Sequence, residues 1–292
     1  MAGLKEIRTR IASVKTTRQV TSAMKMVSAA KLKKAQDAII QIRPYADKMF
    51  QILSSLGAGF YNAEDSIYTK SRDCKRVLIV LISSNRGLCG GFNSSIAKKA
   101  DELARTTYGK QLAHDEVRFL AIGKQGERLL HHWKLDVAEE KNKLFDQLVF
   151  DNVSVVANEI MQEYVKGQYD CVELVYNQFK NAGVQVAVTE KFLPVEIEKN
   201  KNEKTVFDFI YEPSNDYVIH DLVPRSLKIQ FYKALLDSNA AEHGARMTAM
   251  HQATDNATEL LKELTLQYNK ARQSAITREI LEIVSGAEAL RG

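Results

Sequence analysis

The sequence contains little that interrupts a helix near either end. It has four prolines and 14 glycines among 292 residues. Only Gly3 and Pro44 occur before Gly57, and no proline follows Arg225. Because both residue types break long helices, their scarcity predicts a helical N-terminal segment over residues 1–58 and a helical C-terminal segment over residues 215–290.

Long hydrophobic runs are also missing. The most apolar run, Val77–Ile82, has the length of a strand and not the roughly 18 residues that a membrane span needs. The first ten residues are charged and no apolar stretch follows them, which excludes an ordinary secretory signal. The basic, acid-poor first 35 residues also fit an organelle presequence, but a helix seam described below explains them better.

Cysteine is scarce and shows no pattern. The three cysteines, at positions 74, 89 and 171, are far apart and have neither CxxC nor zinc-ligand spacing. We therefore expect a reducing compartment. His131 and His132 are neighbours in sequence and point in different directions on a helix, so we expect surface residues and no metal site.

Acidic residues are rare in the first 48 positions. This segment holds eleven lysines and arginines against three acidic residues, whereas the whole chain has a net charge of +5, so the remainder is mildly acidic. A basic segment on an acidic body indicates either a solvated helix face or an acidic partner: nucleic acid, an anionic membrane or a protein surface. No aromatic residue precedes Tyr45 to stack on bases, which favours the acidic protein.

The middle of the chain, residues 75–205, has a different pattern. Runs rich in β-branched residues, such as RVLIVLIS, VRFLAIG and CVELVYN, alternate with helical patterns and glycines. This alternation is typical of an α/β domain.

Both ends carry apolar residues at alternating spacings of three and four, the pattern of a coiled-coil seam. In the N-terminal segment we expect a first stripe through Leu4, Ile7, Ile11 and Val14, and then a shifted stripe through Val20, Met24, Val27, Lys31 and Ala35. The C-terminal stripe runs through Met247, Met250, Thr254, Ala257, Leu261, Leu264, Tyr268, Ala271 and Ala275. After Arg272 it changes phase to Ile276, Ile280, Ile283, Ala287 and Leu290.

Neither long helix can bury its apolar stripe alone, and the sequence predicts no other long helix with such a stripe. Each of the two is therefore the expected partner of the other. We therefore predict an α/β plus long coiled-coil fold, in which the N- and C-terminal segments form an antiparallel two-helix coiled coil with an inserted Rossmann-like α/β domain. A helical bundle is the alternative, but it would need short loops between several helices, and the sequence does not contain them.

One segment resembles a phosphate-binding loop. Ser83–Asn93 follows a predicted strand and opens a helix, and it contains Arg86, Gly87, Cys89, Gly90 and Gly91. Its G-x-x-G-G spacing is neither the dinucleotide fingerprint nor a P-loop. It is either a cofactor loop or a tight structural or contact loop, and we expect the latter. Cys89 has no nearby histidine to act as its base, and no other catalytic pattern occurs, so we expect no catalytic residues, no cofactor and no enzyme activity of the chain itself.

Four segments resemble the gamma subunits of F-type ATP synthases of the bacterial type. They are LKEIRTRIASVKTTRQVTSAMKMVSAAKLKKAQ (4–36), SSNRGLCGGFN (83–93), Tyr211-Glu212-Pro213, and the closing stretch from Arg246 to Leu290. Asn85 stands where that family more often has Asp. Residues 100–205 resemble it only in their α/β pattern.

The resemblance implies a non-catalytic central-stalk rotor that couples proton flow through a membrane ring to conformational cycling of catalytic beta subunits. The implied partners are three alpha and three beta subunits per copy, an epsilon subunit and the membrane c-ring, without nucleic acid or a small-molecule substrate. The implied location is the cytoplasmic face of a bacterial inner membrane, as a peripheral protein. The absence of the cysteine-bearing insertion of chloroplast relatives favours a bacterial source.

The resemblance also implies roles for particular residues. Contacts to the alpha/beta ring fall to Met24, Lys25, Lys31, Lys33, Arg246, Arg272, Gln273, Ile276, Ile280, Ile283 and Val284. Tyr211 and Glu212 would contact the membrane ring or the epsilon subunit. Packing alone is an equal alternative for Met24 and the isoleucines.

Three other classes of function stay open at this point. A coiled-coil scaffold that never rotates would share the seams, and stoichiometry would distinguish it. A nucleotide-dependent enzyme would bind phosphate at Gly87–Gly91, and its melting temperature would rise when the ligand is added. A nucleic-acid binder would show a steep dependence on salt.

Overall fold

The computed structural model describes residues 3–59, 67–68, 72–195 and 215–290. Tyr211 and Glu212, predicted to contact the membrane ring or the epsilon subunit, lie outside the described residues. The described chain divides into two compact units, Met1–Ser28 with Met247–Gly292, and Ala29–Arg246. The predicted domain limit at residue 205 lies outside the described residues, and the limits at residues 58, 75 and 215 stay a prediction.

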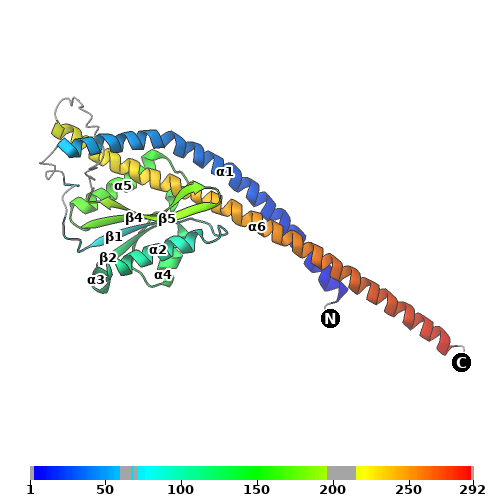
Figure 1. The fold of residues 1–292 in the computed structure, drawn as a ribbon. Helices are drawn as coiled ribbons and strands as arrows, with labels where there is room; N and C mark the ends of the chain where they lie inside the picture. Colours follow the sequence, from blue (N-terminus) through cyan, green and yellow to red (C-terminus); the bar gives the residue numbers. More distant parts are fainter. Residues whose placement is uncertain (1–2, 60–66, 69–71, 196–214, 291–292) are drawn as a thin grey trace. The chain divides into compact units, whose positions relative to one another are not determined.

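Two long helices, α1 (Leu4–Gly59) and α6 (Asn215–Ala289), begin and end the described chain (Figure 1). At a rise of 1.5 Å per residue they would be about 84 Å and about 112 Å long. Pro44 and Pro224 lie inside them and do not end them. Within the described residues, no helix has the combination of length and apolar character that a membrane span requires.

A five-stranded sheet of order β3-β2-β1-β4-β5 lies between the two helices in sequence. The strands are β1 (Val77–Ile82), β2 (Val117–Ile122), β3 (Val137–Glu140), β4 (Cys171–Asn181) and β5 (Val184–Leu193). The first four are parallel, and β5 pairs antiparallel with β4. The connecting elements are α2 (Phe92–Thr106), α3 (Gly109–Ala113), α4 (Lys124–His132), the 3₁₀ helix η2 (Asn142–Phe145) and α5 (Phe150–Val165).

The two faces of the sheet bury different cores, because alternate residues of a strand point to opposite faces. Leu78, Val80 and Ile82 of β1 pack with buried residues of α5 and with residues 223–235 of α6. Val77, Ile79 and Leu81 pack with residues of α2 and with Leu130 of α4. All six β1 side chains are buried, as expected for a central parallel strand covered on both faces. The predicted fold, an α/β domain inserted between two long helices, is confirmed.

In the smaller unit, the start of α1 runs antiparallel to the end of α6 (Figure 1). The predicted C-terminal seam is confirmed, since every position of the stripe from Met247 to Ala275 is buried or half-buried. A hydrogen bond of 2.8 Å joins the hydroxyls of Thr21 and Thr254. This polar pair lies between the two helices and ties their register.

The predicted phase shift of the N-terminal seam is wrong at Val20, Val27 and Lys31, which are exposed, whereas Met24 is half-buried and Ala35 is buried. Val20 and Val27, placed on the seam, are 51% and 58% exposed. The less exposed stripe keeps its original phase and continues through Arg18, Thr21, Lys25, Ser28, Leu32, Ala35 and Ile39. Polar side chains occupy much of the seam between residues 18 and 28, and Val20 and Val27 lie on the exposed face of the helix.

Cys74 and Cys171 form a disulfide across 97 residues, with their Cα atoms 5.5 Å apart. This differs from the expectation of a reducing compartment. The reason is topological: parallel pairing sets Val77 of β1 beside Cys171 of β4, which brings Cys74, three residues earlier, to the same end of the sheet. Cys89 is the free cysteine of the chain, and it is buried.

Candidate functional site

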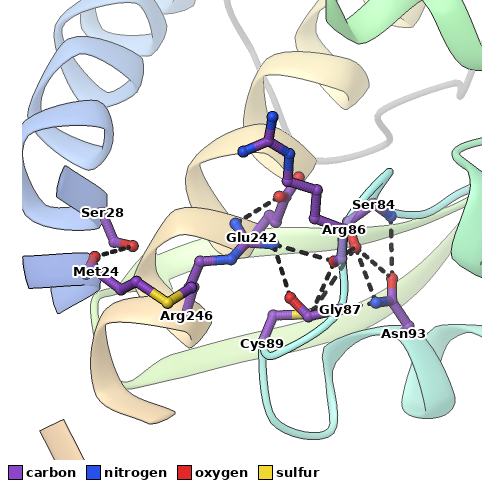
Figure 2. A network of polar contacts seen from close by, with 9 residues as sticks. All are labelled: Met24, Ser28, Ser84, Arg86, Gly87, Cys89, Asn93, Glu242 and Arg246. Atoms are coloured by element: carbon purple, nitrogen blue, oxygen red, sulfur yellow. Dashed lines mark hydrogen bonds and ion pairs between the residues drawn. The ribbon is translucent and has the colours of Figure 1, made fainter. Parts of the chain in front are cut away.

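The glycine-rich loop between β1 and α2 is closed by its own polar groups (Figure 2). Ser84 donates its backbone N–H to Asn93 Oδ1 at 3.0 Å and its hydroxyl to the Arg86 carbonyl at 2.7 Å. Asn93 Nδ2 lies 3.1 Å from the Cys89 sulfur. Burial raises the pKa of the Cys89 thiol, although the Ser84 hydrogen bond and Arg246 act against this. The thiol is therefore kept neutral, which suits packing better than nucleophilic chemistry.

Arg246 of α6 binds this loop from outside it (Figure 2). Its Nη2 donates to the carbonyls of Arg86 at 3.1 Å and Gly87 at 3.3 Å. Its Nη1 forms a 2.6 Å ion pair with Glu242, one helical turn earlier. Both side chains are almost fully buried, at 9% and 11% exposed. Sequence reasoning missed Glu242, although the i,i+4 spacing of opposite charges on a predicted helix was the available signal.

The tip of the loop is strained and exposed. Leu88 has φ of +63° and is 66% exposed. A left-handed backbone is costly for a residue with a branched side chain. Arg86 and Gly87 are exposed beside it, whereas Cys89 is buried. The loop therefore holds a cation and an apolar side chain outward on a fixed backbone.

A second glycine-containing turn, Gly123–Gly126, allows close packing of the backbone. Ser83 Oγ donates to the Gly123 carbonyl at 2.9 Å and accepts the Gly126 N–H at 2.9 Å. A Cβ at Gly126 would lie 2.5 Å from Ser83 Oγ, and at Gly123, where φ is +111°, it would lie 2.5 Å from the Ser83 carbonyl oxygen. The glycines thus let the ends of β1 and β2 approach each other.

Two further titratable residues of α6 are shielded from water: Asp237 is buried and His243 is half-buried. Desolvation raises the pKa of Asp237 to about 6, although Arg43 of α1 lies 3.8 Å away. Desolvation, with Arg246 and Lys31 acting in the same direction, lowers the pKa of His243 to about 4. His243 is therefore neutral at pH 7.

Among the described residues, one group has donor atoms close enough to hold a metal ion. Glu127, His131 and Glu140 place one ligand atom each within 4.8 Å of the others. Asn142 Nδ2 already donates to Glu127 at 2.6 Å and to Glu140 at 3.4 Å. The predicted role of His131 as a surface residue fits its exposure.

The structure presents the other predicted contact residues in different ways. Lys31 and Lys33 are exposed, whereas Met24 and Lys25 are half-buried. On α6, Arg272 and Gln273 are exposed, and so are the apolar residues beyond them: Ile276 46%, Ile280 54%, Ile283 71% and Val284 54%. Arg246 differs from all of these because its side chain is buried and its guanidinium is already bound to oxygen atoms of this chain.

Comparison with known proteins gives one consistent family. The family described as ATP synthase matches residues 3–290. The ATP synthase gamma chains of Flavobacterium psychrophilum and Flavobacterium johnsoniae are each 53% identical to this chain over 292 residues, covering all of both chains. That of Cytophaga hutchinsonii is 48% identical and covers 99% of each chain.

Solved structures agree with the sequence relatives. A chain of the central stalk and c-ring of Tetrahymena thermophila mitochondrial ATP synthase matches 80% of this chain and 99% of its own length, with 26% identity and a TM-score of 0.57. A chain of the Euglena gracilis mitochondrial enzyme has the same fold over 98% of this chain and 94% of its own, with 17% identity and a TM-score of 0.70. The chain therefore belongs to the ATP synthase gamma chain family.

Proposed function

We propose that the chain is the rotor of its ATP synthase, coupling proton flow through a membrane ring to conformational cycling of three catalytic beta subunits. It would itself catalyse nothing and bind no cofactor, since nucleotides would bind the ring. A rotating body can bias three equilibria in turn only if its faces differ, because a ligand shifts an equilibrium through differential affinity.

The observation that carries this proposal is the exposed end of α6. Beyond Ala275 the helix continues to Ala289 with every described residue exposed. Large apolar side chains among them reach 71% exposure at Ile283. Exposed apolar surface of this kind marks an interaction site. An apolar end suits a bearing, because close ion pairs would favour one angular position over others.

The proposed partners are three alpha and three beta subunits per copy of this chain, an epsilon subunit and a membrane c-ring. The named relatives and the c-ring assemblies among similar structures support this set. The proposed location is the cytoplasmic face of a bacterial inner membrane, reached as a peripheral member of the complex. Tyr211 and Glu212 are proposed contacts to the c-ring or epsilon subunit.

The proposed contacts to the alpha/beta ring lie on both long helices. Lys31 and Lys33, with Met24 and Lys25 nearby in sequence, would face acidic segments of the beta subunits. Arg272 and Gln273 offer exposed hydrogen-bond donors on α6. The apolar tip is Ile276, Ile280, Ile283 and Val284.

Reconstitution tests the proposal. Purified chain is mixed with alpha and beta subunits, and the mass of the product and its ATPase activity are measured. We expect one copy per three alpha and three beta subunits, and no ATPase activity from the chain alone. A chain that stays free, or that joins the ring as a second or third copy, contradicts the proposal.

A matched pair of variants separates specific contact from general surface charge. Arg272→Ala removes an exposed side chain from the proposed contact, and Lys262→Ala removes an exposed side chain from the same helix ten residues earlier. We expect the first to lower the ATPase activity of the complex about tenfold or more, the effect of losing a charged hydrogen bond at an interface. The second should leave activity within twofold of wild type.

A further inference from the structure

We infer that Arg246 is a positioning residue, which acts on the ring through the loop that it holds and not by touching the ring itself. The inference rests on the proposed function for its final step. Sequence resemblance alone placed Arg246 among the direct contacts. Its side chain, however, is only 9% exposed, and its guanidinium is already bound to three oxygen atoms of this chain.

The geometry uses the fork of the guanidinium. One terminal nitrogen binds the Glu242 carboxylate, and the other binds the carbonyls of two successive loop residues, Arg86 and Gly87 (Figure 2). Lysine has a single ammonium on a flexible stem and does not present two separated donor nitrogens in one plane. Arginine at this position therefore does more than neutralise Glu242.

The loop is fixed on its opposite side as well. Ser84 Oγ donates to the same Arg86 carbonyl that Arg246 binds, and Asn93 holds Ser84 in turn. Asn85 Nδ2 donates to the Asn142 carbonyl at 2.8 Å. Arg246 thus completes a set of contacts around residues 84–87, and it is the contact that comes from α6.

The consequence of this arrangement is at Leu88. Its left-handed backbone and 66% exposure are costly unless neighbouring contacts hold them. Because the two carbonyls bound by Arg246 directly precede Leu88, release of Arg246 frees the strained turn to relax. Arg86 and Leu88 would then lose the fixed position in which they meet a partner.

Hydrogen exchange of the isolated chain tests the contact of Arg246 with the carbonyls of Arg86 and Gly87, here called the latch, without any partner. The reporters are the backbone amides of Ser84 and Phe92, which are bonded to Asn93 Oδ1 and the Cys89 carbonyl. Arg246→Gln combined with Glu242→Gln removes both charges, so no unpaired charge stays buried. We expect exchange in 84–92 to be about tenfold faster or more, with the β4 amides unchanged.

Two variants set the interpretation. Arg246→Lys keeps the charge beside Glu242 but loses the fork, and it should exchange as fast as the double variant. Arg225→Gln breaks an exposed ion pair with Asp221 on the same helix and should exchange as wild type. Unchanged exchange in the double variant, or full protection by lysine, would overturn the latch.

Activity of the reconstituted complex tests the second step. If Arg246 acts through the loop, Arg246→Lys and Leu88→Ala should each lower ATPase activity. The ATPase activity of the combined variant should then be within twofold of that of the less active single variant. The inference would be overturned if the losses of activity in the combined variant multiplied, or if Arg246→Lys caused no loss. It would also be overturned if Arg246→Lys lowered activity but neither Leu88→Ala nor Arg86→Ala did. Failure of the wild-type chain to assemble with alpha and beta subunits would contradict the proposed function instead. The exchange experiment would still show whether Arg246 holds the loop.

Discussion

At the scale of single residues, buried polar side chains gather on one stretch of α6. Counted as whole residues, Asp237, Ser238, Glu242 and Arg246 are all below 10% exposed. Glu242 and Arg246 compensate each other, whereas Asp237 Oδ1 and Ser238 Oγ have no hydrogen-bond partner among the described residues. A buried group without a full set of partners costs stability, so Asp237 is the residue at which pH should act most directly.

We expect Asp237 to lower the free energy of unfolding as pH rises. Its pKa is about 6 in the folded chain against an ordinary 3.8, so its contribution is fully present below pH 3.8 and is lost as pH rises through 6. Facing charges are Arg43, Lys233 and Glu190. We expect Asp237→Asn to gain about 2–3 kcal/mol over wild type at pH 7.5, with no gain at pH 3.5. Urea unfolding at both pH values measures this.

The control for that series is Asp221→Asn, because Asp221 is 57% exposed on the same helix. Its difference from wild type should stay within about 0.5 kcal/mol at either pH. An Asp237→Asn chain that is no more stable than wild type at pH 7.5 would show that the carboxylate is well compensated.

The disulfide gives a second prediction at this scale. It closes a long loop of 97 residues, and cross-links of this kind typically contribute about 2–4 kcal/mol by restricting the unfolded chain. We expect reductant to lower the free energy of unfolding of wild type by this amount and to leave the Cys74→Ser, Cys171→Ser chain unchanged. Thiol titration showing three free cysteines in the oxidised wild type would contradict the bond.

At the scale of elements, the long helices are stabilised by seams of different quality. The α6 seam is apolar over much of its length, and Leu264 is 3% exposed. The α1 seam carries Thr21 and Ser28, whose hydroxyls bond to Thr254 and to the Met24 carbonyl. Polar seam residues specify register at some cost in stability.

Leu264→Ala should lower the free energy of unfolding of the paired helices by about 2–4 kcal/mol, because it leaves a cavity in the seam. Val27→Ala shortens an apolar side chain at an exposed position, so it should change the free energy of unfolding by less than about 0.5 kcal/mol. Helicity followed by circular dichroism in urea measures both. Equal losses would mean that the seam follows the phase first expected from the hydrophobic residues.

The sequence allowed the elements and the α6 seam to be predicted, since helix breakers and apolar spacing are local signals. It misled on α1, because the true seam holds polar Arg18, Thr21 and Lys25 while apolar Val20 and Val27 lie outside. The disulfide and the contacts of Arg246 with the loop carbonyls could not be predicted from it. They join residues 97 and about 160 positions apart, and only strand order and helix placement bring these together.

At the scale of the whole molecule, the chain presents a buried α/β core and, separately, a helix end with no partner among the described residues. The apolar tip should matter to assembly and not to folding. We expect the triple variant Ile276→Ser, Ile280→Ser, Ile283→Ser to keep the thermal midpoint of the isolated chain within about 2 °C, since these side chains are exposed. Its complex with alpha and beta subunits should dissociate at least tenfold faster, as measured by subunit exchange. Loss of folding, or unchanged dissociation, would contradict the bearing role.

The proposed rotor function requires that this chain turns inside a ring of alpha and beta subunits. Lys110→Cys places an accessible thiol at an exposed position of α3, while Cys89 is buried and the other cysteines are bonded, so a bead can be attached at one position. With the alpha/beta ring fixed to a surface, the bead is followed by microscopy as ATP is added. The account predicts continuous rotation in one direction that stops without ATP; a bead that stays still while the same complexes hydrolyse ATP would contradict it.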